Sequence, residues 1–185
     1  VAQANRRPRI VPANANEQWS MDFMSDVLSN GRRLRTLNIV DDATRECLAI
    51  EVDTSLSGIR VARVLTEIGH MRSLPKRIVV DNGPEFIARA VCQWLRENGC
   101  GTIFTAPGSP WENPYIERFN GRLRDECLNM EVFRNGREAQ WVVESWRRDY
   151  NEQRPHSSLN YLTPAEFAVS QRQHNIDFLE HQANE

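Results

Sequence analysis

The sequence has no long hydrophobic run and almost no lysine. No apolar stretch approaches the roughly 18 residues of a membrane-spanning helix, and no signal peptide opens the chain. Lys76 is the only lysine among 23 basic residues, so the other 22 (23 − 1) are arginines. A net charge of −2 does not by itself indicate a nucleic-acid-binding protein. Arginine suits phosphate recognition, although a biased genome composition would explain its abundance equally well.

Cysteine and histidine are also sparse, with four of each. No two cysteines have CxxC spacing, and the histidines show no ligand pairing. A structural zinc site and a disulfide framework are therefore not expected. A reducing cytoplasm is the expected compartment.

The length of 185 residues allows one substantial core with tails. Residues 1–16 are rich in Ala, Asn, Pro and Arg and have no periodicity, which is typical of a linker. The folded core is expected over residues 17–171, followed by a loose polar tail over 172–185. Because the first residue is Val, we interpret the chain as a piece of a longer protein.

Hydrophobic periodicity predicts an α/β fold. Alternation and turn signals favour three antiparallel strands over residues 19–27, 34–40 and 47–52. The next helix is expected from a cap at Ser55 or Ser57 to about His70, with a buried face at Ile59, Ala62, Val64, Leu65 and Ile68. The later expectations are strands over 77–80 and 102–105, and helices over 85–98, 113–130, 137–151 and 164–171. This order predicts a mixed five-stranded sheet, three strands antiparallel and then two parallel, with helices on both faces.

Three acidic residues occupy positions that suit a divalent metal site. Asp22 lies within the first predicted strand, Asp81 ends the fourth, and Glu117 lies one turn into a helix. Two-metal phosphoryl chemistry needs carboxylate oxygens on rigid elements, and two or three acids suffice for hard cations such as Mg²⁺. If the two strands are neighbours, Asp22 and Asp81 lie side by side, and Glu117 closes the site.

Each acid has a simpler explanation when it is taken alone. Asp22 would be a surface acid on an edge strand, although Asp is depleted from strands. Asp81 would be a turn former before Asn-Gly. Glu117 would be an acid favoured by the helix dipole. The three in this order are far more specific than any one of them.

The helix that carries Glu117 is predicted to have two faces. Its polar face, which would meet either a phosphate backbone or water, comprises Asn113, Glu117, Asn120 and Arg124. Its apolar face comprises Ile116, Phe119, Leu123 and Cys127.

Three motifs carry a family resemblance. Residues 19–23 (WSMDF), 80–86 (VDNGPEF) and 113–121 (NPYIERFNG) resemble the DDE catalytic core of retroviral integrases, and more closely that of related bacterial insertion-sequence transposases. Segments between 150 and 168, including RPHSSL and LTPAEF, resemble the C-terminal signature of those transposases. The resemblance covers residues 18–168, and the 35 residues between Asp81 and Glu117 match the family spacing.

The resemblance implies a ribonuclease-H-like fold in which Asp22, Asp81 and Glu117 bind two Mg²⁺ (or Mn²⁺) ions. It implies nicking of element ends, followed by attack of the freed 3′-hydroxyl on a second phosphodiester. It further implies a missing N-terminal helix-turn-helix region, a dimer or larger assembly, and action on bacterial, nucleoid-associated DNA. The implied DNA contacts are Asn113, Asn120 and Arg124, to which we add Arg154 and His156.

Two other functions stay open: a ribonuclease-H-like nuclease without joining activity, and a silent domain that binds DNA or multimerises.

Some further residues have two interpretations each. His156 contacts DNA or, as we favour, braces the last helix. Trp111 and Tyr115 stack on bases or pack the loop before the Glu117 helix. Glu85 lies close enough to Asp81 to influence the site. A turn role is favoured over metal binding for Asp41, Asp42 and Asp53.

Overall fold

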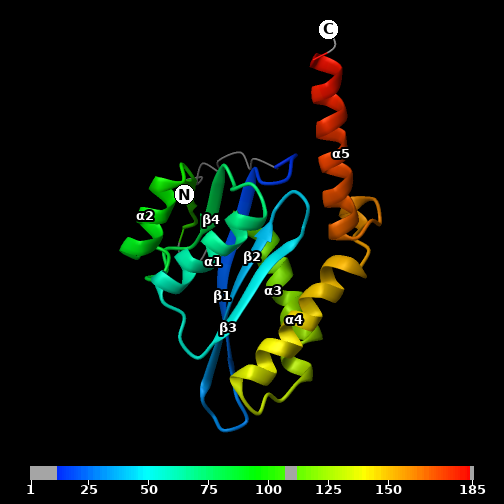
Figure 1. Ribbon diagram of the computed structural model, residues 1–185. Coiled ribbons are helices and arrows are strands. Elements are labelled where there is room, and N and C mark those ends of the chain that lie inside the picture. The colour runs from blue at the N-terminus through cyan, green and yellow to red at the C-terminus, as the bar shows by residue number, and fades with distance from the viewer. Residues whose placement is uncertain (1–11, 107–111, 184–185) are drawn as a thin grey trace, which may run out of the picture.

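The computed structural model describes residues 12–106 and 112–183, so Trp111 and most of the predicted linker lie outside the described residues. Its centre is a five-stranded sheet in the order β3-β2-β1-β4-β5 (Figure 1). β1 pairs antiparallel with β2, and β2 with β3, whereas β1–β4 and β4–β5 are parallel. The predicted mixed sheet is confirmed. The strands are β1 (Gln18–Val27), β2 (Arg33–Asp41), β3 (Cys47–Asp53), β4 (Arg77–Val80) and β5 (Gly101–Phe104).

Helices cover both faces of the sheet, as predicted (Figure 1). Ser57 caps α1, because its side chain accepts a hydrogen bond from the backbone amide of Arg60. None of the helices in the part of the chain that the structure describes is both long and apolar enough to cross a membrane. The helices are α1 (Gly58–Met71), α2 (Arg89–Glu97), α3 (Pro114–Glu126), α4 (Gly136–Glu152) and α5 (Pro164–Ala183), with 3-10 turns η2 (Leu128–Met130) and η3 (Ser157–Leu159).

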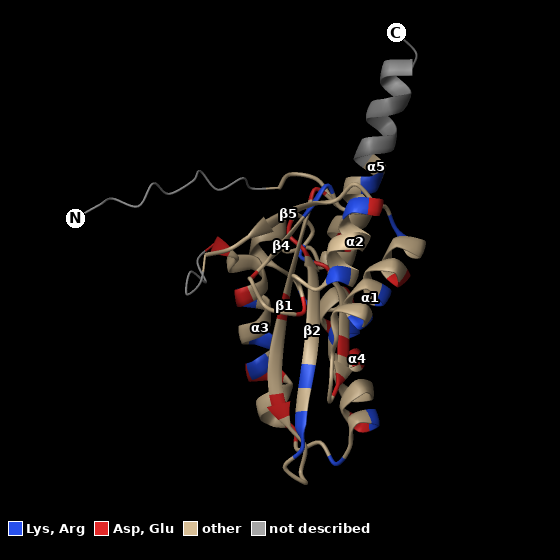
Figure 2. Cartoon of the chain, turned by 90° about the vertical axis from the view of Figure 1, so that its left-hand side faces the viewer, with Lys and Arg blue, Asp and Glu red and all other residues tan. Residues whose placement is uncertain are grey.

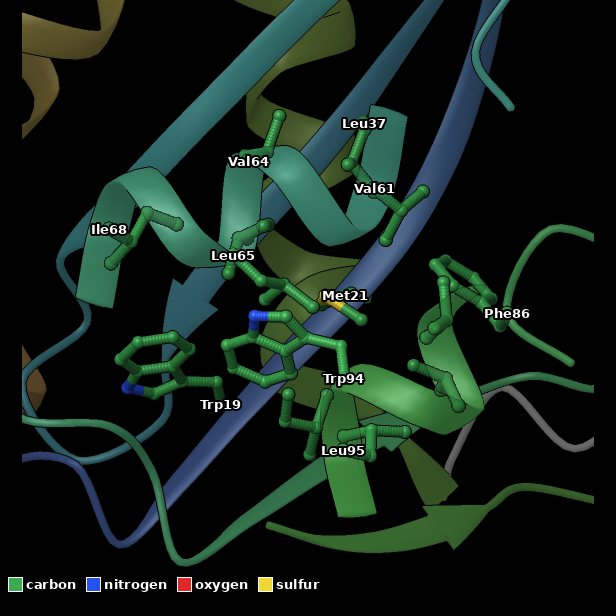
Figure 3. Close-up of a cluster of buried hydrophobic side chains, with 14 of the residues drawn as sticks. Trp19, Met21, Leu37, Val61, Val64, Leu65, Ile68, Phe86, Trp94 and Leu95 are labelled. Atoms are coloured by element: carbon green, nitrogen blue, oxygen red, sulfur yellow. The ribbon is translucent and has the colours of Figure 1, made fainter. Parts of the chain in front are cut away.

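One hydrophobic core lies between the sheet and the helices α1 and α2. Trp19 and Met21 of β1 point into it, together with alternate residues of β2 and β4. Figure 3 shows α1 crossing above these side chains, with Trp94 and Leu95 of α2 beside them. Phe86, from the segment between β4 and α2, closes the cluster.

A second core fills the opposite face, under α3 and α4. It includes Met24 of β1, Leu34 and Val40 of β2, and the apolar side of α3. The ring of Phe119 meets the rings of Trp146 and Tyr150 edge-on, with centroids 5.6 and 5.0 Å apart. These contacts fix the rotation of α3 about its own axis, and with it the direction of its polar residues.

Several predicted helix details were wrong. Ile59, predicted to be buried, is 75% exposed, because Gly58 lies against the segment before α2 and turns Ile59 outward. A Cβ at Gly58 would meet Cβ of Ala88 at 2.4 Å. α2 begins four residues late, since the amides of Phe86 and Ile87 donate to the Gly83 carbonyl in a turn.

The ends of two later helices also differ from the prediction. α3 ends at Glu126, and its expected last turn is the separate 3-10 turn η2. α5 continues to Ala183 instead of ending near residue 171. No Gly or Pro follows residue 171, and polar composition alone does not stop a helix.

Two buried acids, Asp41 and Asp42, hold the chain together where β2 ends. Asp41 Oδ1 accepts hydrogen bonds from the backbone amides of Ala43 and Thr44, which is the turn role predicted for it. Asp42 Oδ2 accepts from Gln18 Nε2 (2.6 Å) and Ser20 Oγ (2.8 Å). Burial raises the pKa of Asp42 to about 7, against these hydrogen bonds, which lower it.

Replacing Phe119 by Ala tests the α3–α4 core. The substitution removes a side chain that is 1% exposed and leaves a cavity under α3. We expect it to lower the free energy of unfolding in urea by about 3–5 kcal/mol. The control Trp141→Ala, at a side chain 72% exposed, should change it by less than about 0.5 kcal/mol. Equal losses in the two variants would contradict the proposed packing.

The stability of the protein should depend on the protonation of Asp42. Its pKa in the folded state, about 7, lies above the ordinary value of 3.8, so the folded state binds the proton more tightly than the unfolded state. The stabilisation that comes from the proton on Asp42 is fully present below about pH 4, and it is lost as the pH rises through about 7. Urea unfolding of the wild type should give a lower free energy at about pH 8 than at about pH 5. Asp42→Asn should reduce that difference, and equal differences in both proteins would contradict this account.

Candidate active site

The pairing of β1 with β4 aligns two of the three predicted acids. Ser20 lies opposite Val79 in the parallel register. Two residues further along each strand, Asp22 comes opposite Asp81, just beyond the end of β4. Because side chains alternate along a strand, Asp22 points to the face that α3 covers. The condition placed on these two acids, that their strands be neighbours, is therefore met.

Asp22 is partly buried and held from two sides. Its Oδ1 accepts a hydrogen bond from the backbone amide of Phe23 (2.8 Å), and its Oδ2 accepts one from Asn120 Nδ2 of α3 (2.7 Å). Burial and the charges of Asp81 and Glu117 together raise the pKa of Asp22 to about 6, against the lowering by the two hydrogen bonds. Asp81 and Glu117 thus lie close enough to Asp22 for their charges to act on it.

Asp81 lies in a turn that is braced from β1 and β2. Its Oδ1 accepts a hydrogen bond from the Gly83 amide (2.7 Å), and a Cβ at position 83 would meet that oxygen at 2.8 Å. Glu85 pairs with Arg35 of β2, which also lies over the Phe23 ring at 4.5 Å. Arg35 could not be predicted from local sequence patterns, because its partner lies 50 residues away.

Glu117 lies on the first turn of α3, where its side chain is exposed. The helix begins with Pro114. Proline suits the first helical position because it has no backbone N–H that would need a hydrogen-bond acceptor. The buried residues Ile116 and Phe119 on either side anchor this turn to the core. Glu117 is therefore free to face the two aspartates while the helix beneath it is fixed.

The donor set suits a hard divalent cation, because three carboxylates supply the oxygen ligands that Mg²⁺ prefers. The negative charges of Asp81 and Glu117 act on Asp22, and a bound cation would neutralise this negative charge. In the arrangement seen here, Asp81 is turned toward its own loop. Over residues 12–106 and 112–183, no three acidic, histidine or cysteine side chains are yet arranged to ligate one ion.

Among the predicted DNA contacts, two asparagines are buried. Asn120 accepts a hydrogen bond from Asn38 Nδ2 of β2 (2.7 Å) and donates to Asp22. Asn38 was not predicted as a site residue, although a polar residue at an inward strand position is a usable signal. Asn113 is 7% exposed, and no described group bonds to its Oδ1. Asn120 thus acts on Asp22 directly, and its contact with DNA stays a prediction.

The other predicted DNA contacts lie along the outer side of α3 and beyond it. Arg124 donates to the Ser25 carbonyl (2.9 Å), and Arg154 pairs with Glu126 (2.6 Å). His156 is 6% exposed and packs edge-on against Tyr150. Its backbone amide donates to the carbonyl of Leu162, which lies just before α5. The contact of His156 with DNA and its bracing of the last helix both stay predictions.

The stacking candidate Tyr115 lies under another side chain. The guanidinium of Arg45, in the turn after β2, lies 4.0 Å from the centre of the Tyr115 ring. The remaining acid, Asp53, accepts a hydrogen bond from the Thr54 amide at the end of β3 (2.6 Å), in keeping with a turn role.

Comparisons with known proteins agree with this geometry. Two models of the family described as "Integrase core domain" match residues 12–110 and 98–164. The first alone covers more than half of the chain, and together they include Asp22, Asp81 and Glu117.

Relatives come from bacterial insertion elements. The insertion element IS407 uncharacterized 31.7 kDa protein of Burkholderia multivorans is 49% identical over 167 residues, covering 90% of this chain and 60% of that protein. The transposase InsD for insertion element IS2D of Escherichia coli is 27% identical over 166 residues, covering 86% and 55%. The chain therefore spans little more than half the length of these relatives.

Solved structures share the fold. The HTLV-2 integrase catalytic core domain, in complex with magnesium, superposes with a TM-score of 0.66 at 12% identity, covering 84% of this chain and 97% of that one. At this identity the likeness concerns the fold alone. The family matches, the insertion-element relatives and the shared fold confirm the predicted resemblance to insertion-sequence transposases of the DDE type. The chain belongs to the integrase core domain family.

Proposed function

We propose that this chain is the catalytic core of a transposase that cuts and joins DNA strands with the help of divalent metal ions. The observation that carries the proposal is the alignment of Asp22 with Asp81 on neighbouring parallel strands, with Glu117 close enough for its charge to act on Asp22. Asp22, Asp81 and Glu117 would hold two Mg²⁺ or Mn²⁺ ions. Bound there, the ions would activate the attacking oxygen and stabilise the leaving oxygen of a phosphodiester.

The protein's own groups set up this chemistry. Asn120 presents its amide to Asp22 Oδ2 and keeps that carboxylate directed at the site. The Arg35–Glu85 pair holds the turn that carries Asp81. Arg124 lies about two turns after Glu117 on the same face of α3. It is proposed to contact a phosphate near the cut, with Arg154 further along the same DNA strand.

The substrate would be the ends of a bacterial insertion element and a target DNA, handled by two or more copies of the protein in the cytoplasm. Action on two DNA ends needs at least a dimer, because one chain supplies one set of acids. A nuclease that cuts without joining would need the same three acids, so only an assay of joining separates the two. A silent DNA-binding domain would not need the acids at all.

Removing any one of the three acids should abolish catalysis. Asp22→Asn, Asp81→Asn and Glu117→Gln each replace a charged ligand by a neutral amide, and we expect metal-dependent nicking of supercoiled DNA to fall to background. Calorimetry should show weaker Mn²⁺ binding in the same proteins. The control Asp125→Asn, at an exposed acid of α3, should behave as wild type. Wild-type nicking by Asp81→Asn would remove Asp81 from the site.

Asn120→Ala tests the positioning of Asp22. In the wild type, the hydrogen bond from Asn120 to Asp22 Oδ2 lowers the pKa of that carboxyl. The variant loses this hydrogen bond, so the pKa of Asp22 should rise above about 6. Mn²⁺ affinity at neutral pH should fall about 10- to 100-fold. NMR titration of the carboxyl carbon and Mn²⁺ calorimetry measure the two effects. Asn129→Ala, at an exposed asparagine of η2, is the control. An unchanged pKa in Asn120→Ala would contradict the positioning role.

A further inference from the structure

A second, basic site lies on the other flank of α3. A cavity of about 70 Å³ lies between α3, the turn after β2 and the segment that leads into η3. At roughly 30 Å³ for each water in the liquid, this volume admits a few waters or one small polar group. Its polar lining includes Arg45, Arg118, Arg122, His156, Ser157 and Ser158.

The charge of this cavity is not neutralised. No acidic side chain lines it. Within the described ranges, neither Arg118 nor Arg122 forms an ion pair, whereas Arg154 nearby is paired with Glu126. Arg45 donates to the backbone carbonyl of Asp42 and stacks on Tyr115. Its charge acts on the Asp42 carboxyl, which does not line the cavity. Three arginines around one small cavity repel one another unless an anion lies between them.

The histidine at this cavity senses the same positive field. Burial and the charges of Arg122, Arg154 and Arg45 together lower the pKa of His156 to about 4, so the ring is neutral at neutral pH. Its Nε2 is buried without a hydrogen-bond partner among the described residues. Every charge close to the ring except Glu126 therefore favours an anion over a cation.

We propose that this cavity binds one phosphate group of a DNA strand. Arg118, Ser157 and Ser158 are exposed, so the cavity opens to the surface. A phosphate that is part of a DNA strand can therefore enter it, as well as a small free anion. Arg118 and Arg122 are one turn apart and follow Glu117 on α3, and Figure 2 shows basic positions along this helix. A strand held at the three acids would then place another of its phosphates in the cavity. The inference rests on the proposed function and adds a phosphate site to it.

The test is an NMR titration that follows the imidazole signals of His156. One arm adds inorganic phosphate, and the other adds a short single-stranded DNA oligonucleotide. Both are repeated on the double variant Arg118→Gln/Arg122→Gln. The matched control is Arg96→Gln/Arg137→Gln, which removes two exposed arginines that do not line the cavity. Mn²⁺ calorimetry on each protein reports on the acids separately.

The oligonucleotide should shift the His156 signals saturably in the wild type, and at lower concentration than phosphate does. Its affinity should fall about tenfold or more in Arg118→Gln/Arg122→Gln, because each charge-assisted contact is worth about a factor of ten. The control should stay within about twofold, and Mn²⁺ binding should not change in either variant.

Two results would overturn the inference: His156 signals that neither ligand moves, or signals that only inorganic phosphate moves. The wild-type titration decides this even if a variant does not fold. Failure of the proposed function gives a different pattern, since Mn²⁺ would then not bind at the acids while the oligonucleotide still shifts His156.

Discussion

The parallel pairing of β1 with β4 is the contact on which the candidate site depends. It joins the antiparallel strands at the start of the chain to the second half of the sheet. Trp19 and Met21 fix its register, because both are fully buried against α1 and α2. A slip of one residue would turn them to the opposite face and take Asp22 away from α3. The energy of the core thus sets the position of the acid.

The second constraint is the rotation of α3, which Phe119 sets by packing against Trp146 and Tyr150. With that face buried, Glu117 and Asn120 are directed to the Asp22 side, and Arg118 and Arg122 lie toward the basic cavity. One helix therefore separates a negatively charged site from a positively charged one. This arrangement suits a substrate that brings phosphates and needs metal ions.

The sequence predicted the strands well because alternation and turn residues are local signals. The three acids could be proposed as one site because two follow strand geometry and the third lies in the first turn of a helix. The bracing residues Arg35 and Asn38 were not found, since their partners Glu85 and Asn120 lie 50 and 82 residues away. The error at Ile59 has a similar cause: the buried side of α1 was decided by close packing at Gly58, and helical periodicity alone cannot fix such a contact.

The most direct test of the central claim is a crystal structure of the protein soaked with Mn²⁺, with the ions located by their anomalous scattering. The account predicts Mn²⁺ between the carboxylates of Asp22 and Asp81, with Asp81 turned out of its hydrogen bond to the Gly83 amide. A second ion should lie near Glu117. Mn²⁺ bound elsewhere, with Asp22 and Asp81 free of metal, would contradict the account.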